Sequence, residues 1–338
     1  MRRSDVCGAT RSTFRYGHER MSSHPVVALL RERAERGSAP GSRQDPHRLA
    51  LVLEGGGMRG VVSAAMTAAL ERLGFAQCFD IVAGASAGAI NAAALLAGEA
   101  QRATAAYCGP LASRSFVNPL RALRGKPVID VNTVLDYVAG LDAAGHERVT
   151  GSEVKLLCVA TDVESARPVV LQGMRTEREL WDAILASSRM PWAGGPPVEL
   201  GGRRYLDGGM SAPIPVPEAV EAGATHVLVL QTRPFGIPRK STSRIGDRLI
   251  ERHLRGLNPA LVDLYRARIA SYDVVVDEIA RRSADPGGNG PYVLGIRPAA
   301  GTPCVGQLER RSELLAAAAA DAERLVESLF AAHRAVAV

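Results

Sequence analysis

From Leu49 onward, short apolar runs alternate with segments in which apolar residues recur every three or four positions. A short, mostly apolar run is typical of a strand buried on both faces, and the wider spacing is typical of an amphipathic helix. We therefore predict strands at Leu49–Leu53, Ile81–Ala83, Val154–Thr161, Pro168–Leu171, Arg204–Leu206, Val227–Gln231 and Tyr292–Ile296. Strands that alternate with helices predict an α/β fold with a mostly parallel central sheet and helices on both faces.

The predicted helices fill the intervals between these strands. Val61–Leu73 follows the first strand and Ala89–Ala97 follows the second. The clearest helix is Glu177–Ser188, which a Thr-x-x-Glu capping box opens at Thr176. At the C-terminus, Leu308–Ala335 predicts a long Ala/Leu-rich helix with at most one break.

Composition changes at about residue 48. Residues 1–48 are polar and Arg-rich, with one short predicted helix at Val26–Arg36 and a Ser-Ala-Pro-Gly-Ser linker, so we expect a flexible arm. We divide the remainder into a core of residues 49–231 and a C-terminal extension of residues 232–338. This extension is predicted to be helical with one further strand and to pack on the same domain, because no internal repeat separates the two parts.

The amino-acid composition is that of a folded protein of enzyme size: 46% of the 338 residues are hydrophobic and 22% are charged. The formal net charge of +6 is concentrated in residues 1–48, which carry ten basic and five acidic side chains and leave the rest at +1. We therefore expect no nucleic-acid partner. The 18 residues from Ile81 to Gly98 lack charge, but glycines and polar residues interrupt them, which favours a buried helix over a membrane span.

The cysteines suggest a reducing compartment. They are five in number, widely spaced and free of any C-x-x-C pair, which argues against a disulfide framework and against a zinc site. No apolar stretch of signal-peptide length follows the basic residues at the start. We expect a cytoplasmic protein without a zinc site.

A glycine-rich loop directly follows the first predicted strand and reads Gly55-Gly56-Gly57-Met58-Arg59-Gly60. Glycines let the backbone approach a ligand closely, and the free N–H groups before a helix form a cradle for an anion or an oxyanion. The loop also satisfies G-x-G-x-x-G, and Asp80 lies 20 residues further on, as in dinucleotide-binding proteins. A phosphate-binding Walker loop is excluded, because valines stand where its Lys and Ser/Thr belong. Both the oxyanion and the dinucleotide interpretation stay open on this loop alone.

A second cluster, Gly84-Ala85-Ser86-Ala87-Gly88, lies between a predicted strand and a predicted helix. In that context G-x-S-x-G forms a nucleophile elbow, in which small flanking residues permit the strained turn that exposes the serine. A serine hydroxyl is a weak nucleophile until a base accepts its proton. The histidines His226 and His253 are candidates for a triad, although a surface or core role suits each of them better. A carboxylate base is offered by Asp207, which ends a short strand and is followed by Gly208 and Gly209.

In this order the three clusters resemble the patatin-like phospholipase family. The resemblance extends firmly from Leu49 to Gln231, and it includes four connecting segments: Ala160-Thr161-Asp162, Ser187-x-x-Met190-Pro191, Pro196-Pro197-Val198 and Ile214-Pro215-Val216. One departure is Met210-Ser211-Ala212-Pro213, where many relatives carry asparagines, so substrate contacts there are expected to differ.

The resemblance implies a three-layer α/β/α fold and a Ser–Asp dyad. Ser86 would attack an ester carbonyl, Asp207 would accept its proton, and the loop Gly55–Gly60 with Arg59 would stabilise the oxyanion. The implied activity is that of a phospholipase A, lysophospholipase or esterase that acts on a lipid or ester substrate without a metal or a cofactor.

Two alternatives are kept: an NAD(P)-dependent oxidoreductase built on Gly55–Gly60, and a non-catalytic lipid-binding protein. Two basic segments, Gly109–Pro127 and Arg239–Leu257, are candidates for a lid or for transient contact with a membrane surface. A solvated loop and an ordinary basic helix that packs its apolar face inward are the favoured explanation of these two segments. The sequence does not indicate an oligomeric state.

Overall fold

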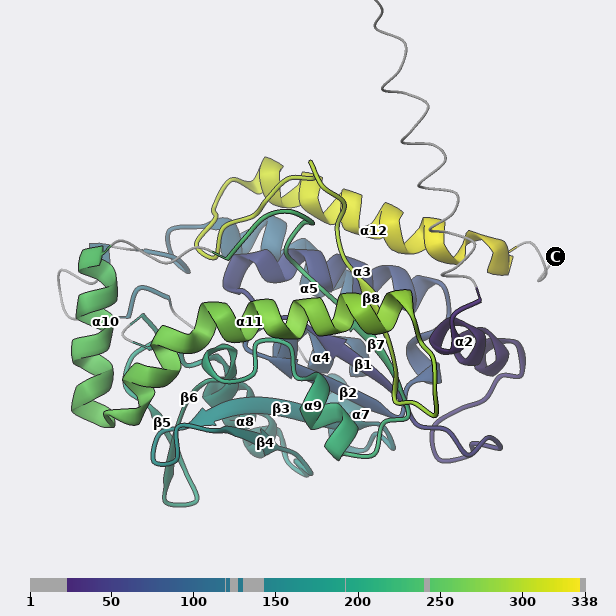
Figure 1. The fold of residues 1–338 in the computed structure, drawn as a ribbon, viewed down its shortest axis with the longest axis horizontal. Helices are drawn as coiled ribbons and strands as arrows, with labels where there is room; N and C mark the ends of the chain where they lie inside the picture. The colour runs from purple at the N-terminus through teal and green to yellow at the C-terminus, as the bar shows by residue number, and fades with distance from the viewer. Residues whose placement is uncertain are drawn as a thin grey trace, which may run out of the picture.

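A single mixed, mostly parallel sheet forms the centre of the protein in the computed structural model, which describes residues 23–118, 120–121, 127–129, 143–191, 193–239 and 244–334 (Figure 1). Its strands run in the order β5-β6-β3-β2-β1-β7-β8, and β4 pairs with β3. The strand bounds are β1 Leu49–Leu53, β2 Ile81–Ala85, β3 Lys155–Asp162, β4 Pro168–Leu171, β5 Val198–Leu200, β6 Arg203–Asp207, β7 His226–Leu230 and β8 Tyr292–Ile296. The predicted α/β class is therefore confirmed.

Helices cover both faces of this sheet, because successive strand residues point to opposite sides. On β1, Leu49, Leu51 and Leu53 enter one core, and Ala50 and Val52 enter the other. The first face is covered by α2 Pro25–Glu35, α3 Val61–Arg72, α4 Ala87–Leu96, α5 Ala100–Cys108 and α8 Glu177–Ser188. The second face is covered by α9 Val216–Glu221 and α11 Ala260–Ala284.

The remaining helices lie further out. α12 Ser312–Arg334 packs along α3 and α5 as an additional outer layer, seen in yellow in Figure 1. α10 Arg244–Leu257 contacts α11, and α7 Ala143–Thr150 contacts α8. Short 3-10 helices are found at η1 Gly57–Gly60, η2 Ala76–Cys78, η3 Pro110–Ala112 and η5 Gly208–Met210. None of the helices in the described part of the chain combines the length and apolar character that a bilayer crossing demands.

Each of the seven predicted strands has a counterpart in the structure, and β5 was missed. β5 has only three residues and pairs only with β6, so it lacks the apolar run that identifies a buried strand. The predicted C-terminal helix begins later than expected, at Ser312, and runs unbroken to Arg334.

The expectation of a flexible arm over residues 1–48 is wrong for residues 23–48, whereas residues 1–22 lie outside the described part. Helix α2 packs Val26, Val27, Leu29 and Leu30 into the core on the first face. The sequence suggested an arm because this helix is short and sits in an Arg-rich region. Its apolar side is nevertheless long enough to dock beside β7 and β8.

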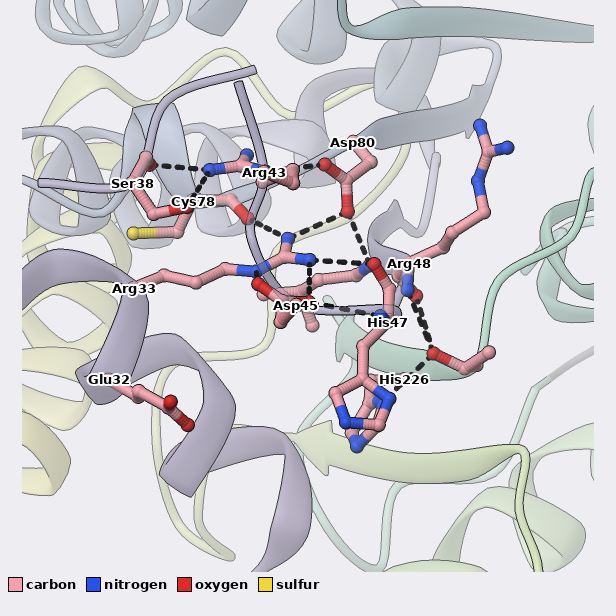
Figure 2. Close-up of polar contacts among 12 residues, drawn as sticks. Glu32, Arg33, Ser38, Arg43, Asp45, His47, Arg48, Cys78, Asp80 and His226 are labelled. Atoms are coloured by element: carbon pink, nitrogen blue, oxygen red, sulfur yellow. Dashed lines mark hydrogen bonds and ion pairs between the residues drawn. The ribbon is translucent and has the colours of Figure 1, made fainter. Parts of the chain in front are cut away.

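A buried ion cluster fixes this segment to the amino-terminal edge of the sheet (Figure 2). Arg33, only 1% exposed, forms ion pairs of 2.8 Å with Asp45 and 2.7 Å with Asp80. It also donates to the carbonyl oxygens of Cys78 and His47, each at 2.7 Å. Arg43 holds the other oxygen of Asp80 at 2.7 Å. With two hydrogen bonds to Asp45, the Arg33 guanidinium uses all five of its N–H groups. These bonds join α2 to the segments that lead into β1 and β2.

Replacing Arg33 by alanine is expected to lower the free energy of unfolding by about 3–5 kcal/mol, because two partly buried carboxylates lose their main partner. Urea unfolding followed by circular dichroism measures the change. Arg36→Ala, on the same helix but in an exposed pair with Glu32, is the matched control and should change stability by about 0.5 kcal/mol or less. Equal effects of the two substitutions would contradict a structural role for the cluster.

Candidate active site

Strands β2 and β6 meet end to end along one edge of β3. Val159 of β3 pairs with Ala85, the last residue of β2, and the next residue, Ala160, pairs with Asp207, the last residue of β6. β4 occupies the opposite edge of β3 over the same positions, so β2 and β6 share one edge. Since β2 is parallel and β6 antiparallel to β3, their carboxyl ends converge. This register brings Ser86 and Asp207 together, although 120 residues separate them in the chain.

Ser86 occupies a strained turn between β2 and α4. Its φ of 57° and ψ of −128° lie outside the ordinary regions for a residue with a side chain. The turn requires glycines at Gly84 and Gly88. A Cβ on Gly84 would lie 2.3 Å from the backbone carbon of Gly88, and one on Gly88 would lie 2.3 Å from the carbonyl oxygen of Leu53. Ser86 thus lies in a strained strand-to-helix turn, and its role as a nucleophile stays a prediction.

The hydroxyl of Ser86 donates a hydrogen bond of 2.7 Å to Oδ2 of Asp207. The other carboxylate oxygen, Oδ1, accepts the N–H of Gly209 at 2.7 Å. The N–H of Ser86 donates to the hydroxyl of Ser187 at 3.0 Å, which in turn donates to the carbonyl of Val159. Both ends of the Ser86–Asp207 pair are thus anchored to β3 and its neighbours. Ser187 was noted in the sequence only as part of a connecting segment.

Burial raises the pKa of Asp207 to about 6, and the hydrogen bonds from Ser86 and Gly209 and the charge of Arg239 oppose this shift. A carboxylate with a pKa of about 6 is ionised at neutral pH and is a stronger base than an exposed aspartate. Gly208 permits the close approach, because a Cβ there would lie 2.0 Å from the carbonyl oxygen of Val159.

The glycine-rich loop lines the same cavity as Ser86 and Asp207. Gly56 and Gly57 have φ of 148° and 58°, and a Cβ on Gly55 would lie 2.3 Å from the carbonyl oxygen of Ala85. Within the described residues, no acceptor takes the N–H groups of Gly55, Gly56 or Gly57, whereas Met58 donates to the carbonyl of Gln307. These three N–H groups therefore have no partner within the described residues, and their role in binding an oxyanion stays a prediction.

The last two positions of the loop, Arg59 and Gly60, have other roles. Gly60 does not line the cavity, because it faces the methyl group of Ala87 and the phenol of Tyr107. The guanidinium of Arg59 lies beneath Gly56, donates to the hydroxyl of Thr232 at 3.0 Å and lies 3.7 Å from Glu54. Arg59 lines the cavity but chiefly supports the loop.

Glu54 was not predicted as a site residue. It is 1% exposed and accepts the N–H of Thr232 at 2.6 Å and the hydroxyl of Tyr272 at 3.0 Å. A buried, fully bonded carboxylate directly before the loop links β1 to the C-terminal part of the chain. The only available sequence signal was a charged residue at the end of an apolar strand.

Two cavities adjoin Ser86. The larger, of about 210 Å³, contains Ser86, Asp207 and the glycine loop in its wall together with Arg233 and Arg239. The smaller, of about 40 Å³, extends from Ser86 along apolar side chains. Its apolar lining consists of Met58, Ala87, Ile90, Leu111, Phe116, Ile129 and Met190.

No histidine of the described residues lines either cavity, so the triad alternative is not supported. His226 is the first residue of β7, so it lies at the amino ends of the parallel strands, whereas Ser86 lies at their carboxyl ends. The ring of His226 contacts His47 and Tyr292. Burial lowers the pKa of His226 to about 4. His253 lies on α10.

The dinucleotide interpretation is also wrong for its acidic residue. Ribose recognition needs a carboxylate near the glycine loop, at the carboxyl ends of the strands. Asp80 instead precedes β2 at the amino-terminal edge, where it binds Arg33, Arg43 and the N–H of Leu49 (Figure 2). Among the described residues there is also no cluster of three or more His, Cys, Asp or Glu side chains suited to a metal ion.

Of the two basic segments, Gly109–Pro127 lies partly outside the described residues, as do residues 240–243 of the other. The described part of the first places Leu111 and Phe116 in the smaller cavity. Helix α10 buries Ile250 and Leu254 and exposes Ile245 and Leu249.

Comparison with known proteins identifies the family of this chain. The model of the family described as Patatin-like phospholipase matches residues 51–220. The uncharacterized protein YjjU of Escherichia coli K12 is 34% identical over 194 residues, which are 56% of this chain. The aligned part is 53% of YjjU, so the chain spans about half the length of this curated relative. The crystal structure of VipD from Legionella pneumophila is similar with a TM-score of 0.42 and 14% identity, over 84% of this chain and 67% of VipD. Because the family match covers half of the chain and includes Ser86 and Asp207, this chain belongs to the patatin-like phospholipase family.

Proposed function

We propose that this chain is a serine acyl hydrolase that cleaves lipid-like carboxylic esters through Ser86 and Asp207. The observation that carries the proposal is the 2.7 Å hydrogen bond from the Ser86 hydroxyl to the buried Asp207 carboxylate, in a cavity shared with the loop Gly55–Gly57. A serine at a helix start, a base within hydrogen-bond reach and free backbone donors are the three parts that acyl transfer requires.

In the first half of the reaction, Oγ of Ser86 bonds to the ester carbonyl carbon and its proton passes to Oδ2 of Asp207. The carbonyl oxygen becomes an oxyanion, which the N–H groups of Gly55–Gly57 stabilise. Removal of one such donor typically lowers kcat by ~10²–10³. Collapse of the intermediate expels the alcohol, which takes the proton from Asp207 and leaves an acyl-Ser86.

In the second half, water attacks the acyl carbon and gives one proton to Asp207. Collapse of the second intermediate returns that proton to Oγ of Ser86 and releases the carboxylic acid. The hydrogen bond from Gly209 to Oδ1 keeps Oδ2 directed at Ser86 through both halves.

Support for a lipid-like substrate comes from the smaller cavity. It starts at Ser86 and is lined by apolar side chains, so it suits the first part of an acyl chain. Transient contact with an anionic membrane surface is part of the proposal, because α10 presents Ile245 and Leu249 beside Arg248 and contributes Ile250 to the larger cavity.

The dyad is tested by Ser86→Ala and Asp207→Asn, assayed on p-nitrophenyl esters from butanoyl to palmitoyl and by labelling with a fluorophosphonate. We expect Ser86→Ala to abolish labelling and to lower kcat by at least ~10³-fold, and Asp207→Asn to lower kcat by at least ~10²-fold. The exposed substitutions Ser328→Ala and Asp263→Asn should leave both readouts unchanged. Labelling that persists in folded Ser86→Ala would refute the assignment, and a wild type inactive on every ester would favour a non-catalytic lipid-binding role.

The pH dependence follows from the raised pKa of Asp207. The base must be ionised, so kcat/KM for a short p-nitrophenyl ester should be constant above about pH 7 and fall as pH falls through about 6. Below about pH 5 the loss should approach tenfold per pH unit. Circular dichroism across the range separates this effect from unfolding, and a rate that stays constant down to pH 4 in folded protein would contradict the role of Asp207.

A further inference from the structure

Four arginines line the larger cavity beside Ser86: Arg59, Arg233, Arg239 and Arg268. Three of them lie beyond residue 220, outside the segment that matches the family. Arg233 and Arg239 come from the residues after β7 and lie over the ring of Tyr272, and Arg268 comes from α11. This part of the cavity is therefore supplied by the C-terminal extension.

Two of these arginines already have carboxylate neighbours. Arg59 lies 3.7 Å from Glu54, and Arg268 forms a 3.2 Å ion pair with Asp247 and lies over the ring of Tyr265. Their charges serve the structure around the cavity.

Arg233 and Arg239 form no ion pair within the part of the chain that the structure describes, although the charge of Arg239 acts on Asp207 and opposes the rise of its pKa. Arg233 donates only weakly, to the carbonyl of Pro238 at 3.4 Å, and Arg239 donates to the carbonyl of Arg268 at 3.3 Å. Their guanidinium carbons lie 5.8 and 5.3 Å from the centre of the Tyr272 ring.

Holding these charges together costs free energy. Burial lowers the pKa of Arg239, and the neighbouring charges of Arg59, Arg268 and Arg233 lower it further. Like charges in a partly buried site repel one another, and a bound anion relieves that repulsion. Tyr272 maintains the arrangement, because its hydroxyl is fixed on Glu54 at 3.0 Å.

We infer that Arg233 and Arg239 form a subsite for the phosphate group of an amphiphilic ester whose scissile carbonyl lies at Ser86. The inference rests on the proposed function and narrows its substrate class. Guanidinium groups match the geometry of phosphate oxygens and donate several hydrogen bonds at once.

The same surroundings disfavour a cationic head group. The carboxylates in the described lining are Glu54, whose oxygens are occupied by Thr232 and Tyr272, and Asp207, which is bonded to Ser86. The ring of Tyr272 faces arginines and is not free to receive a quaternary ammonium group. The subsite therefore selects anionic over zwitterionic and neutral esters.

Binding to folded Ser86→Ala protein tests the subsite without requiring turnover. Isothermal titration at pH 8 and constant ionic strength compares octyl phosphate, octyl glucoside and inorganic phosphate. Octyl phosphate should bind at least roughly tenfold more tightly than either of the other two. In the same background, Arg239→Gln and Arg233→Gln should each weaken octyl phosphate roughly 10- to 100-fold, as expected for loss of a charged hydrogen bond.

Arg255→Gln, at an exposed position of α10 outside the cavity lining, is the matched control and should leave the affinity unchanged. Equal binding of octyl phosphate and octyl glucoside, or no effect of either arginine substitution, would overturn the subsite. Inorganic phosphate binding as tightly as octyl phosphate would overturn the head-group assignment in favour of a free-phosphate site.

Activity separates this inference from the proposed function. Wild type that hydrolyses a neutral p-nitrophenyl ester but lacks the octyl phosphate preference would retain the hydrolase and reject the subsite. Tight octyl phosphate binding with no hydrolysis of any ester would retain the subsite and reject the hydrolase.

Discussion

The arrangement of the site depends on the way β3 pairs with two strands along one edge. Lys155–Val159 pair with β2, and Ala160–Asp162 pair with β6, which runs in the opposite direction. Two carboxyl ends therefore meet at the boundary between Val159 and Ala160. In a wholly parallel sheet the end of the neighbouring strand would lie a full strand spacing away. Here Ser86 and Asp207 lie next to each other along the same edge of β3, and Oγ of Ser86 is 2.7 Å from Oδ2 of Asp207.

The carboxyl ends and the amino ends of the sheet strands have different roles. At the carboxyl ends of the strands, backbone strain at Ser86 and the burial of Asp207 are tolerated because β2 and all but the first residue of β3 are buried. At the amino edge, Arg33, Arg43, Asp45 and Asp80 form an ion cluster that ties the preceding segment to the sheet (Figure 2). Asp45 and Asp80, which flank the glycine motif in sequence, thus lie at the far end of the strands in space.

The C-terminal part of the chain completes the cavity rather than forming a separate body. β8 extends the sheet beside β7, and α11 covers the second face. Glu54, directly before the glycine loop, is bonded to Thr232 and Tyr272, so the family core and the residues beyond it share one buried carboxylate. The position of the glycine loop is therefore linked, through Glu54 and Tyr272, to the positions of Arg233 and Arg239.

The sequence by itself determined seven of the eight described strands, the α/β class and the candidate pair, because apolar runs, a capping box and the flanking glycines of Ser86 and Asp207 are local signals. It did not determine that α2 packs into the core or that β5 exists. It also did not determine that Gly60 faces Ala87 and Tyr107, that Arg59 supports the loop, or that Glu54 and Ser187 contact the site. Those features arise from contacts between residues far apart in the chain, such as Arg33 with Asp80 and Glu54 with Tyr272. Only the tertiary structure decided them, since hydrogen-bond partners and burial depend on strand register and helix packing, which no local pattern encodes.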